Sequence, residues 1–229
     1  LLSVVTHELG NPLTSISAFI SLLSKNKSGN LTERDLSMID AITRSETQMR
    51  VLLKDLLDLS RVEANEMELD IDAVDLRDVV RGVAQSMEPI LETKSQSIFL
   101  DQNDEIIDVD GDKSRLDQVV TNLVSNASKY SPDNSEIRLS VSADDESCII
   151  EVADKGIGIS VEDQEKLFTP FFRSDNPETR QVSGTGLGLV ICKQIIELHG
   201  GTMIVRSSRG RGTTVRVELP IAPQGSRSA

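Results

Sequence analysis

The spacing of apolar residues changes near position 67, and this change limits the possible folds more than any other feature of the sequence. In residues 1–66 apolar residues recur every three or four positions, which is the period of an amphipathic helix. Two helices are predicted there, separated by the loop Asn26–Asn30. The second is expected to follow Thr32 and to run from Glu33 to about Glu66.

Beyond position 67, short alternating runs of apolar residues are interleaved with helical stretches, and this mixture predicts an α/β sandwich over residues 67–221. Residues 222–229 carry turn and linker residues and are expected to be disordered. The overall fold class is therefore α+β. The predicted strands are Met67–Ile71, Ser97–Asp101, Ile137–Ser142, Ile149–Ala153, Thr202–Ser207 and Thr213–Leu219, and the predicted helices are Leu76–Leu91, Lys113–Lys129 and Leu187–Leu198.

The second predicted helix of residues 1–66 carries more apolar surface than one hairpin can bury. A heptad frame places Ile39 and Leu53 at one position and Ile42 and Met49 at the other, with polar residues such as Glu46 interrupting it. Two hairpins together bury both stripes as a four-helix bundle. We therefore expect a homodimer.

His7 points away from the apolar stripe of the first predicted helix, and Asn11 follows one turn later on the same outward face. Glu8 is adjacent and is able to accept a proton from the imidazole. Pro12 kinks the helix at this place, which a purely structural helix avoids. The spacing alone leaves a solvated surface histidine and a shaped reactive site equally open.

Two glycine-rich segments lie in the second region. Asp154–Gly158 follows an apolar strand, and Gly184–Leu189 leads into a helical run. Glycines at a helix start allow backbone N–H groups to approach a phosphate, although either segment alone is also consistent with a tight turn.

A third polar segment, Asn122–Tyr130, lies on a predicted helix. Asn122, Asn126 and Lys129 share one face of this helix, where amide oxygens suit Mg²⁺ and a lysine suits phosphate. The alternative is a polar helix face whose terminal lysine complements the helix dipole.

The net charge of −13 argues against nucleic acid or an anionic membrane as the main ligand. It does not argue against a nucleotide, because a phosphate site is built locally. Cys148 and Cys192 are far apart in apparently buried segments, which favours a reduced, cytoplasmic chain. No apolar run approaches the roughly 20 residues that span a bilayer. Helical spacing begins at Leu2 without a cap, so we expect the excised C-terminal part of a longer protein.

Taken together, the motifs resemble those of the sensor histidine kinases of two-component signalling, in order and spacing, over nearly the whole chain. The matching segments are the phosphoacceptor box His7–Leu13, the N box Asn122–Tyr130, the G1 box Asp154–Gly158, the F box Phe168–Arg173 and the G2 box Gly184–Leu189. The resemblance implies a dimerising phosphoacceptor hairpin in residues 1–66 and a Bergerat-type ATP-binding domain in residues 67–221.

The resemblance also implies roles for individual residues. His7 would accept the phosphoryl group, Glu8 would act as its base, and Asn126 would hold Mg²⁺, with Asn122 and Lys129 near the phosphates of ATP. The product would pass to an aspartate of a response-regulator receiver domain.

On the nucleotide side, the resemblance implies that Asp154 accepts a hydrogen bond from the adenine amino group and that Arg173 reaches the γ-phosphate. Gly156 and Gly158 would let the nucleotide approach the backbone. Residues 174–183 would form a mobile lid, for which Phe168, Phe171 and Phe172 are either anchors or ordinary core. The further cofactor-binding positions expected are Tyr130, Ile157, Gly184, Thr185, Gly186, Leu187 and Gly188.

The sequence departs from the family pattern at Gly10-Asn11, where the family usually has Arg-Thr. Asn11 still fits the Glu-x-x-Thr/Asn pattern of phosphatase activity, so a bifunctional enzyme is expected. His199 precedes Gly200-Gly201 and is interpreted as a structural cation at a helix end.

Two other functions remain open at this point. One is another ATPase with the same nucleotide fold, and the other is a pseudokinase that binds nucleotide and scaffolds a partner. Neither nucleic acid nor membrane contact is expected of this fragment, although a missing N-terminal region is expected to be able to anchor the longer protein in the inner membrane.

Overall fold

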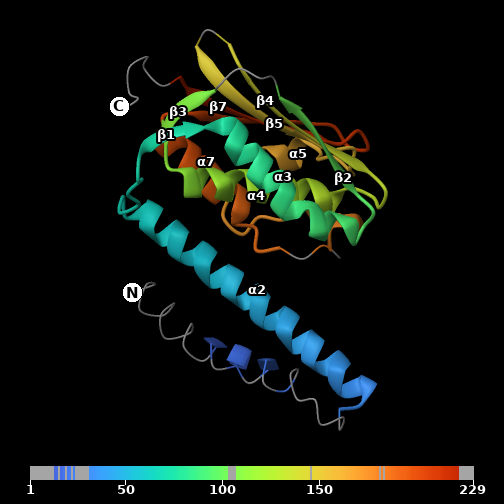
Figure 1. Ribbon diagram of the computed structural model, residues 1–229. Coiled ribbons are helices and arrows are strands. Elements are labelled where there is room, and N and C mark those ends of the chain that lie inside the picture. Colours follow the sequence, from blue (N-terminus) through green and yellow to red (C-terminus); the bar gives the residue numbers. More distant parts are fainter. Residues whose placement is uncertain are drawn as a thin grey trace. The chain divides into compact units, whose positions relative to one another are not determined.

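The computed structural model describes residues 13–14, 16–18, 20–21, 23, 31–102, 107–144, 146–180, 182 and 184–221 (Figure 1). The chain divides into two compact units, Leu1–Met67 and Glu68–Ala229. His7, Glu8 and Asn11, together with the predicted tail 222–229, lie outside the described residues.

The first unit contains helix α2 (Glu33–Glu63), whose ends follow from local hydrogen bonds. Thr32 and Asp35 form a reciprocal capping box, in which Thr32 Oγ1 accepts from Asp35 N–H and Asp35 Oδ2 accepts from Thr32 N–H. At the other end Asn65 adopts a positive φ of 54°, and Glu66 N–H donates to the carbonyl of Arg61 at 2.7 Å. These contacts form a Schellman motif, so α2 ends three residues before the predicted Glu66.

The heptad frame of α2 divides into a buried and an exposed position. Ile39 and Glu46 are 8% and 6% exposed, and the Glu46 carboxylate pairs with Arg50 one turn later at 2.5 Å. By contrast, Ile42 and Met49 are 49% and 47% exposed. A single hairpin therefore leaves the second stripe of the frame in solvent.

The second unit contains two sheets. Strands β1 (Asp72–Asp75) and β3 (Asp108–Gly111) form an antiparallel pair in which Val74 lies opposite Val109. The larger sheet has the order β2-β4-β5-β7-β6, and only β2 and β4 run parallel. Its strands are β2 (Ser97–Gln102), β4 (Glu136–Ala143), β5 (Ser147–Ala153), β6 (Thr202–Ser207) and β7 (Thr213–Pro220).

Three helices cover one face of this larger sheet, as Figure 1 shows: α3 (Leu76–Glu92), α4 (Lys113–Tyr130) and α7 (Gly188–Leu198). Their apolar stripes meet the inward-facing residues of the strands, and Val79, Val124, Ile137, Leu139 and Ile195 are all 0% exposed. The predicted α/β sandwich is confirmed. Both cysteines are buried in this core, and no disulfide joins them in the part of the chain that the structure describes.

One predicted strand is wrong, and three short elements were not predicted. The first strand is β1 and not Met67–Ile71, because the alternating residues 67–71 have no pairing partner, whereas Val74 pairs with β3. The sequence also gave no sign of β3, or of the four-residue helices α5 (Val161–Gln164) and α6 (Pro177–Arg180). Within the described part of the chain, no helix is long and apolar enough to cross a membrane.

Candidate functional site

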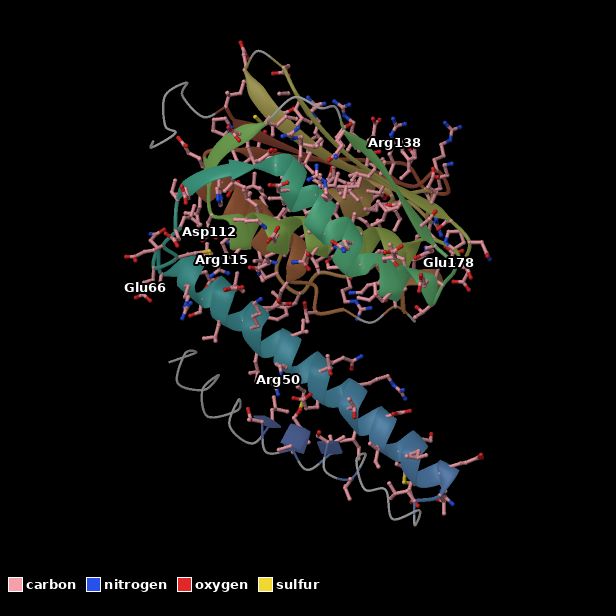
Figure 2. All side chains as sticks on the ribbon, in the orientation of Figure 1. Arg50, Glu66, Asp112, Arg115, Arg138 and Glu178 are labelled. Carbon is pink, nitrogen blue, oxygen red and sulfur yellow. The ribbon has the colours of Figure 1, made fainter. Side chains whose placement is uncertain are left out.

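Helix α4 is fixed at both ends by polar side chains. Asp112 caps its start by accepting from Arg115 N–H at 3.1 Å, and both residues lie at the start of this helix in Figure 2. At its end, the carbonyl of Ser128 accepts from the side chains of Lys94 at 2.8 Å and Gln96 at 3.2 Å. The helix is thereby held rigidly between two anchors.

The predicted polar face of α4 is present. Asn122 and Asn126 are half-buried one turn apart, and Lys129 is exposed near the end of the helix. Half-buried amides at this spacing are positioned by the helix and still accessible to a ligand.

The loop 154–158 packs directly against the end of α4. The Tyr130 carbonyl accepts a hydrogen bond from Ile157 N–H at 3.2 Å, and a Cβ atom on Gly156 would lie 2.3 Å from the same oxygen. Only glycine therefore fits at position 156. This junction brings Tyr130, Gly156 and Ile157 together, as the N and G1 boxes imply.

Asp154 sits at the start of this loop with its carboxylate oriented by the backbone. Its Oδ1 accepts from Gly156 N–H at 2.7 Å and from Thr213 N–H at 3.3 Å. Burial raises the pKa of Asp154, and these two hydrogen bonds oppose the rise. Among the described residues none bonds to Oδ2, so this oxygen remains as an acceptor.

The β6–β7 turn closes the other side of the loop. A Cβ atom on Gly158 would lie 2.0 Å from the Ser208 carbonyl, and one on Gly212 would lie 1.9 Å from the Asp154 carbonyl. Both glycines have positive φ, at 65° and 84°. Packing of the chain on itself thus requires glycine at 156 and 158, and the approach of a nucleotide to these two residues stays a prediction.

Sequence reasoning missed Gly212 and Thr213, which help to hold Asp154 in place. The usable signal was the run Arg209–Thr213, in which two glycines separate two alternating stretches.

The three glycines of the segment 184–188 have different surroundings. Gly186 has a φ of 74°, and its missing Cβ would lie 2.7 Å from the carbonyl carbon of Phe171. Gly188 begins α7, where a Cβ would lie 3.3 Å from Oδ1 of Asn122. Gly184 has open space around it. The segment is therefore tied to the F box at one glycine and to α4 at another.

Other residues of the same segment serve as local anchors. Leu187 is 0% exposed. Thr185 Oγ1 accepts from Leu187 N–H at 3.2 Å, which stabilises the turn before α7.

Arg173 binds backbone carbonyls of the expected lid and of Gly184, which follows it. Its guanidinium donates to the carbonyls of Gly184 at 3.2 Å, Thr179 at 3.4 Å and Val182. It is also close enough to Tyr130 for its charge to lower the pKa of that hydroxyl, against the larger upward effect of burial. Contact of Arg173 with a phosphate stays a prediction.

The three phenylalanines of the F box are not ordinary core. Phe168 and Phe172 are half-buried, with the ammonium groups of Lys193 and Lys166 over their rings at 4.9 Å and 6.0 Å. Phe171 is 56% exposed and has a positive φ of 63°.

Two family models match this chain. The model of the His Kinase A (phospho-acceptor) domain matches residues 1–65, and that of the histidine kinase-, DNA gyrase B-, and HSP90-like ATPases matches residues 111–223. The chain belongs to the sensor histidine kinase family. The paired models separate it from ATPases that share only the nucleotide fold.

Curated histidine kinases match over almost the entire chain. Histidine protein kinase DivJ of Caulobacter vibrioides is 34% identical over 96% of the chain, and sensor histidine kinase WalK of Bacillus subtilis is 33% identical over 94%. The matches cover 37% and 35% of those proteins, so the chain spans about a third of the length of these relatives.

Solved histidine kinase structures share the fold. Full-length ShkA in complex with AMPPNP matches the whole chain with a TM-score of 0.82 at 28% identity, over 46% of its own length. The kinase ThkA in complex with the response regulator TrrA matches 97% of the chain with a TM-score of 0.66 at 27% identity, over 61% of its own length.

Proposed function

We propose that this chain is an ATP-dependent protein histidine kinase, in which His7 takes a phosphoryl group from ATP and passes it to an aspartate of a response regulator. The observation that carries the proposal is the junction at Tyr130. There the loop that carries Asp154 packs against the helix that carries Asn122 and Asn126. The complex of ShkA with AMPPNP supports the same reading.

The groups at this junction suit the two ends of ATP. Asp154 Oδ2 is a half-buried acceptor for the adenine amino group, held in place by the two backbone bonds to Oδ1. On α4, Asn122 and Lys129 supply an amide and a cation for the phosphates.

The described residues fit Mg²⁺ held mainly by the nucleotide. They contain no cluster of three or more His, Cys, Asp or Glu side chains able to cage a metal. Mg²⁺ commonly takes only one or two protein ligands and keeps phosphates and waters, so the half-buried amide of Asn126 is a suitable donor. When bound, the ion neutralises charge on the phosphates.

In the proposed transfer, this chain supplies both the attacking nitrogen and the group that accepts the proton. A ring nitrogen of His7 attacks the γ-phosphorus, an N–P bond forms, the bond to the bridging oxygen breaks, and ADP leaves. Glu8 accepts the proton from the other ring nitrogen. An aspartate oxygen of the receiver domain then attacks the same phosphorus, and the N–P bond breaks. In a separate reaction, Asn11 would orient a water that attacks the phosphorus of the phospho-aspartate, so that the aspartyl O–P bond breaks and inorganic phosphate leaves.

A second copy of the chain is the proposed dimer partner. Met38, Ile42 and Met49 project from one face of α2 and are 50%, 49% and 47% exposed. A four-helix bundle of two hairpins would bury this apolar face. ThkA, whose structure includes the response regulator TrrA, supports a receiver domain as the other partner.

The proposal is tested by incubating the chain with γ-labelled ATP and Mg²⁺, beside the variant His7→Gln. Acid-labile, base-stable label that disappears in the variant is the expected result. Absence of label from both proteins, with tight nucleotide binding retained, would replace the proposal with a pseudokinase scaffold.

A further inference from the structure

His199 is a buried titratable residue that the proposed reaction does not use. The side chain is held at both ring nitrogens: Nδ1 donates to the Ile195 carbonyl at 2.7 Å, and Nε2 accepts from Asp112 N–H at 3.0 Å. His199 is 8% exposed. The ring therefore joins the end of α7 to the start of α4, which fits the structural role interpreted from the sequence.

Gly111 lies close to the ring of His199. A Cβ atom on Gly111 would lie 3.1 Å from Cδ2 of His199 and 3.1 Å from Cδ1 of Leu116. The two hydrogen bonds hold the ring between the end of α7 and the start of α4.

The bond to Asp112 belongs to a consistent set of contacts between α4 and α7, which run antiparallel. His199 meets Asp112 at one end, Cys192 Sγ donates to the Val119 carbonyl at 3.9 Å in the middle, and Gly188 faces the Asn122 amide at the other end. Residues further along α4 meet residues further back along α7. The three contacts thus define one register between the helices.

This register matters because its far end is the candidate nucleotide site. Asn122 lies ten positions after Asp112, about 15 Å along the helix. A slip by one residue would move Gly188 by about 1.5 Å and turn it by about 100° relative to Asn122. A Cβ atom at the position of Gly188 would lie 3.3 Å from Oδ1 of Asn122, so a residue with a side chain brought there by a slip would press on this amide.

Asp112 extends the connection to the segment before β1. Its Oδ1 caps α4, while its Oδ2 accepts from Asp70 N–H at 3.2 Å. One residue therefore joins the start of α4, the end of α7 and the approach to β1.

We propose that His199 is a positioning residue for nucleotide binding, which acts through Asp112 by setting the register of α7 on α4. The inference rests on the nucleotide site proposed above. It predicts that loss of this one contact weakens a site ten residues away, without removing any group that touches the nucleotide.

The test compares His199→Leu, which removes both hydrogen bonds, with His199→Gln, whose amide oxygen restores an acceptor for Asp112 N–H. Val141→Ala is the matched control, because Val141 is 2% exposed on β4 and makes none of the three contacts. The dissociation constant for a non-hydrolysable ATP analogue and the exchange rate of the Asp112 amide are measured on the full chain.

His199→Leu is expected to weaken binding by about fivefold, the factor of one net hydrogen bond, with substantial recovery in His199→Gln. The Asp112 amide should exchange faster in His199→Leu only. Unchanged binding in His199→Leu, or an equal loss in Val141→Ala, would overturn the inference. If the unmodified chain binds no analogue, the proposed function fails. The amide exchange, which needs no nucleotide, then still decides whether His199 sets the register.

Discussion

A Cβ atom on Gly156 would lie 2.3 Å from the carbonyl oxygen of Tyr130, closer than any real side chain can approach a backbone atom. The same oxygen accepts from Ile157 N–H, so the end of α4 and the loop of Asp154 are joined at a single point. Displacement at this point separates the two halves of the proposed nucleotide site.

Gly156→Ala is therefore expected to lower the free energy of unfolding by about 2 kcal/mol, as overpacking of a tight contact does, and to abolish measurable ATP binding. Gly82→Ala is the matched control, because Gly82 has no atom within 4 Å of its Cβ position and lies on α3, outside the residues assigned to the nucleotide. Thermal denaturation and titration with an ATP analogue make the comparison. Equal behaviour of the two variants would contradict the packing argument.

The buried carboxylate of Asp154 is expected to favour ATP binding and to lower the free energy of unfolding. Burial raises its pKa, so the native state holds the proton more strongly than the unfolded state does. The free energy of unfolding consequently falls as pH rises through the interval between the unfolded and native pKa values, and the full destabilisation is present above the native pKa.

Asp154→Asn removes that charge and keeps Oδ1 as the acceptor for Gly156 and Thr213. We expect the melting temperature at neutral pH to rise while the affinity for ATP falls roughly tenfold or more, because the adenine amino group loses a charged acceptor. The stability difference should shrink in acid. A variant that binds ATP normally would remove Asp154 from the adenine site.

The elements that sequence predicted well are those whose signal is local. The shared face of Asn122 and Asn126 follows from helical spacing, and both residues lie on α4 as expected. Strand β3 escaped prediction because Val109 is its only large apolar residue among aspartates, and pairing with β1 is what makes it a strand.

In the candidate site, too, the features that escaped prediction depend on contacts between residues far apart in sequence. Gly212 must be glycine because the Asp154 carbonyl lies 1.9 Å from its Cβ position, and the two residues are far apart in sequence. The hydrogen bond of His199 to Asp112 likewise joins residues far apart in sequence, and no local pattern around His199 reveals it. Long-range backbone contacts, and not composition, decide both.

Asn11 separates the two activities expected of the hairpin. Asn11→Ala should leave autophosphorylation of His7 unchanged, because the residue contributes no group to that step. It should reduce the dephosphorylation of the response regulator to near background, because the attacking water loses its orienting amide. Phosphorylation and release of inorganic phosphate are measured with the same purified regulator, and unchanged phosphatase activity would refute the assignment.

The exposed stripe of α2 makes a prediction about assembly that does not depend on nucleotide. Met49 and Val51 are 47% and 49% exposed, but they lie about 200° apart around the helix, so only Met49 shares a face with Ile42. Met49→Glu would bury an unpaired charge in the bundle and should raise the dimer dissociation constant on the order of a hundredfold. Val51→Glu adds the same charge to the opposite face and should leave the dimer intact. Sedimentation equilibrium distinguishes the two, and equal weakening by both variants would mean that the dimer uses a different face of α2.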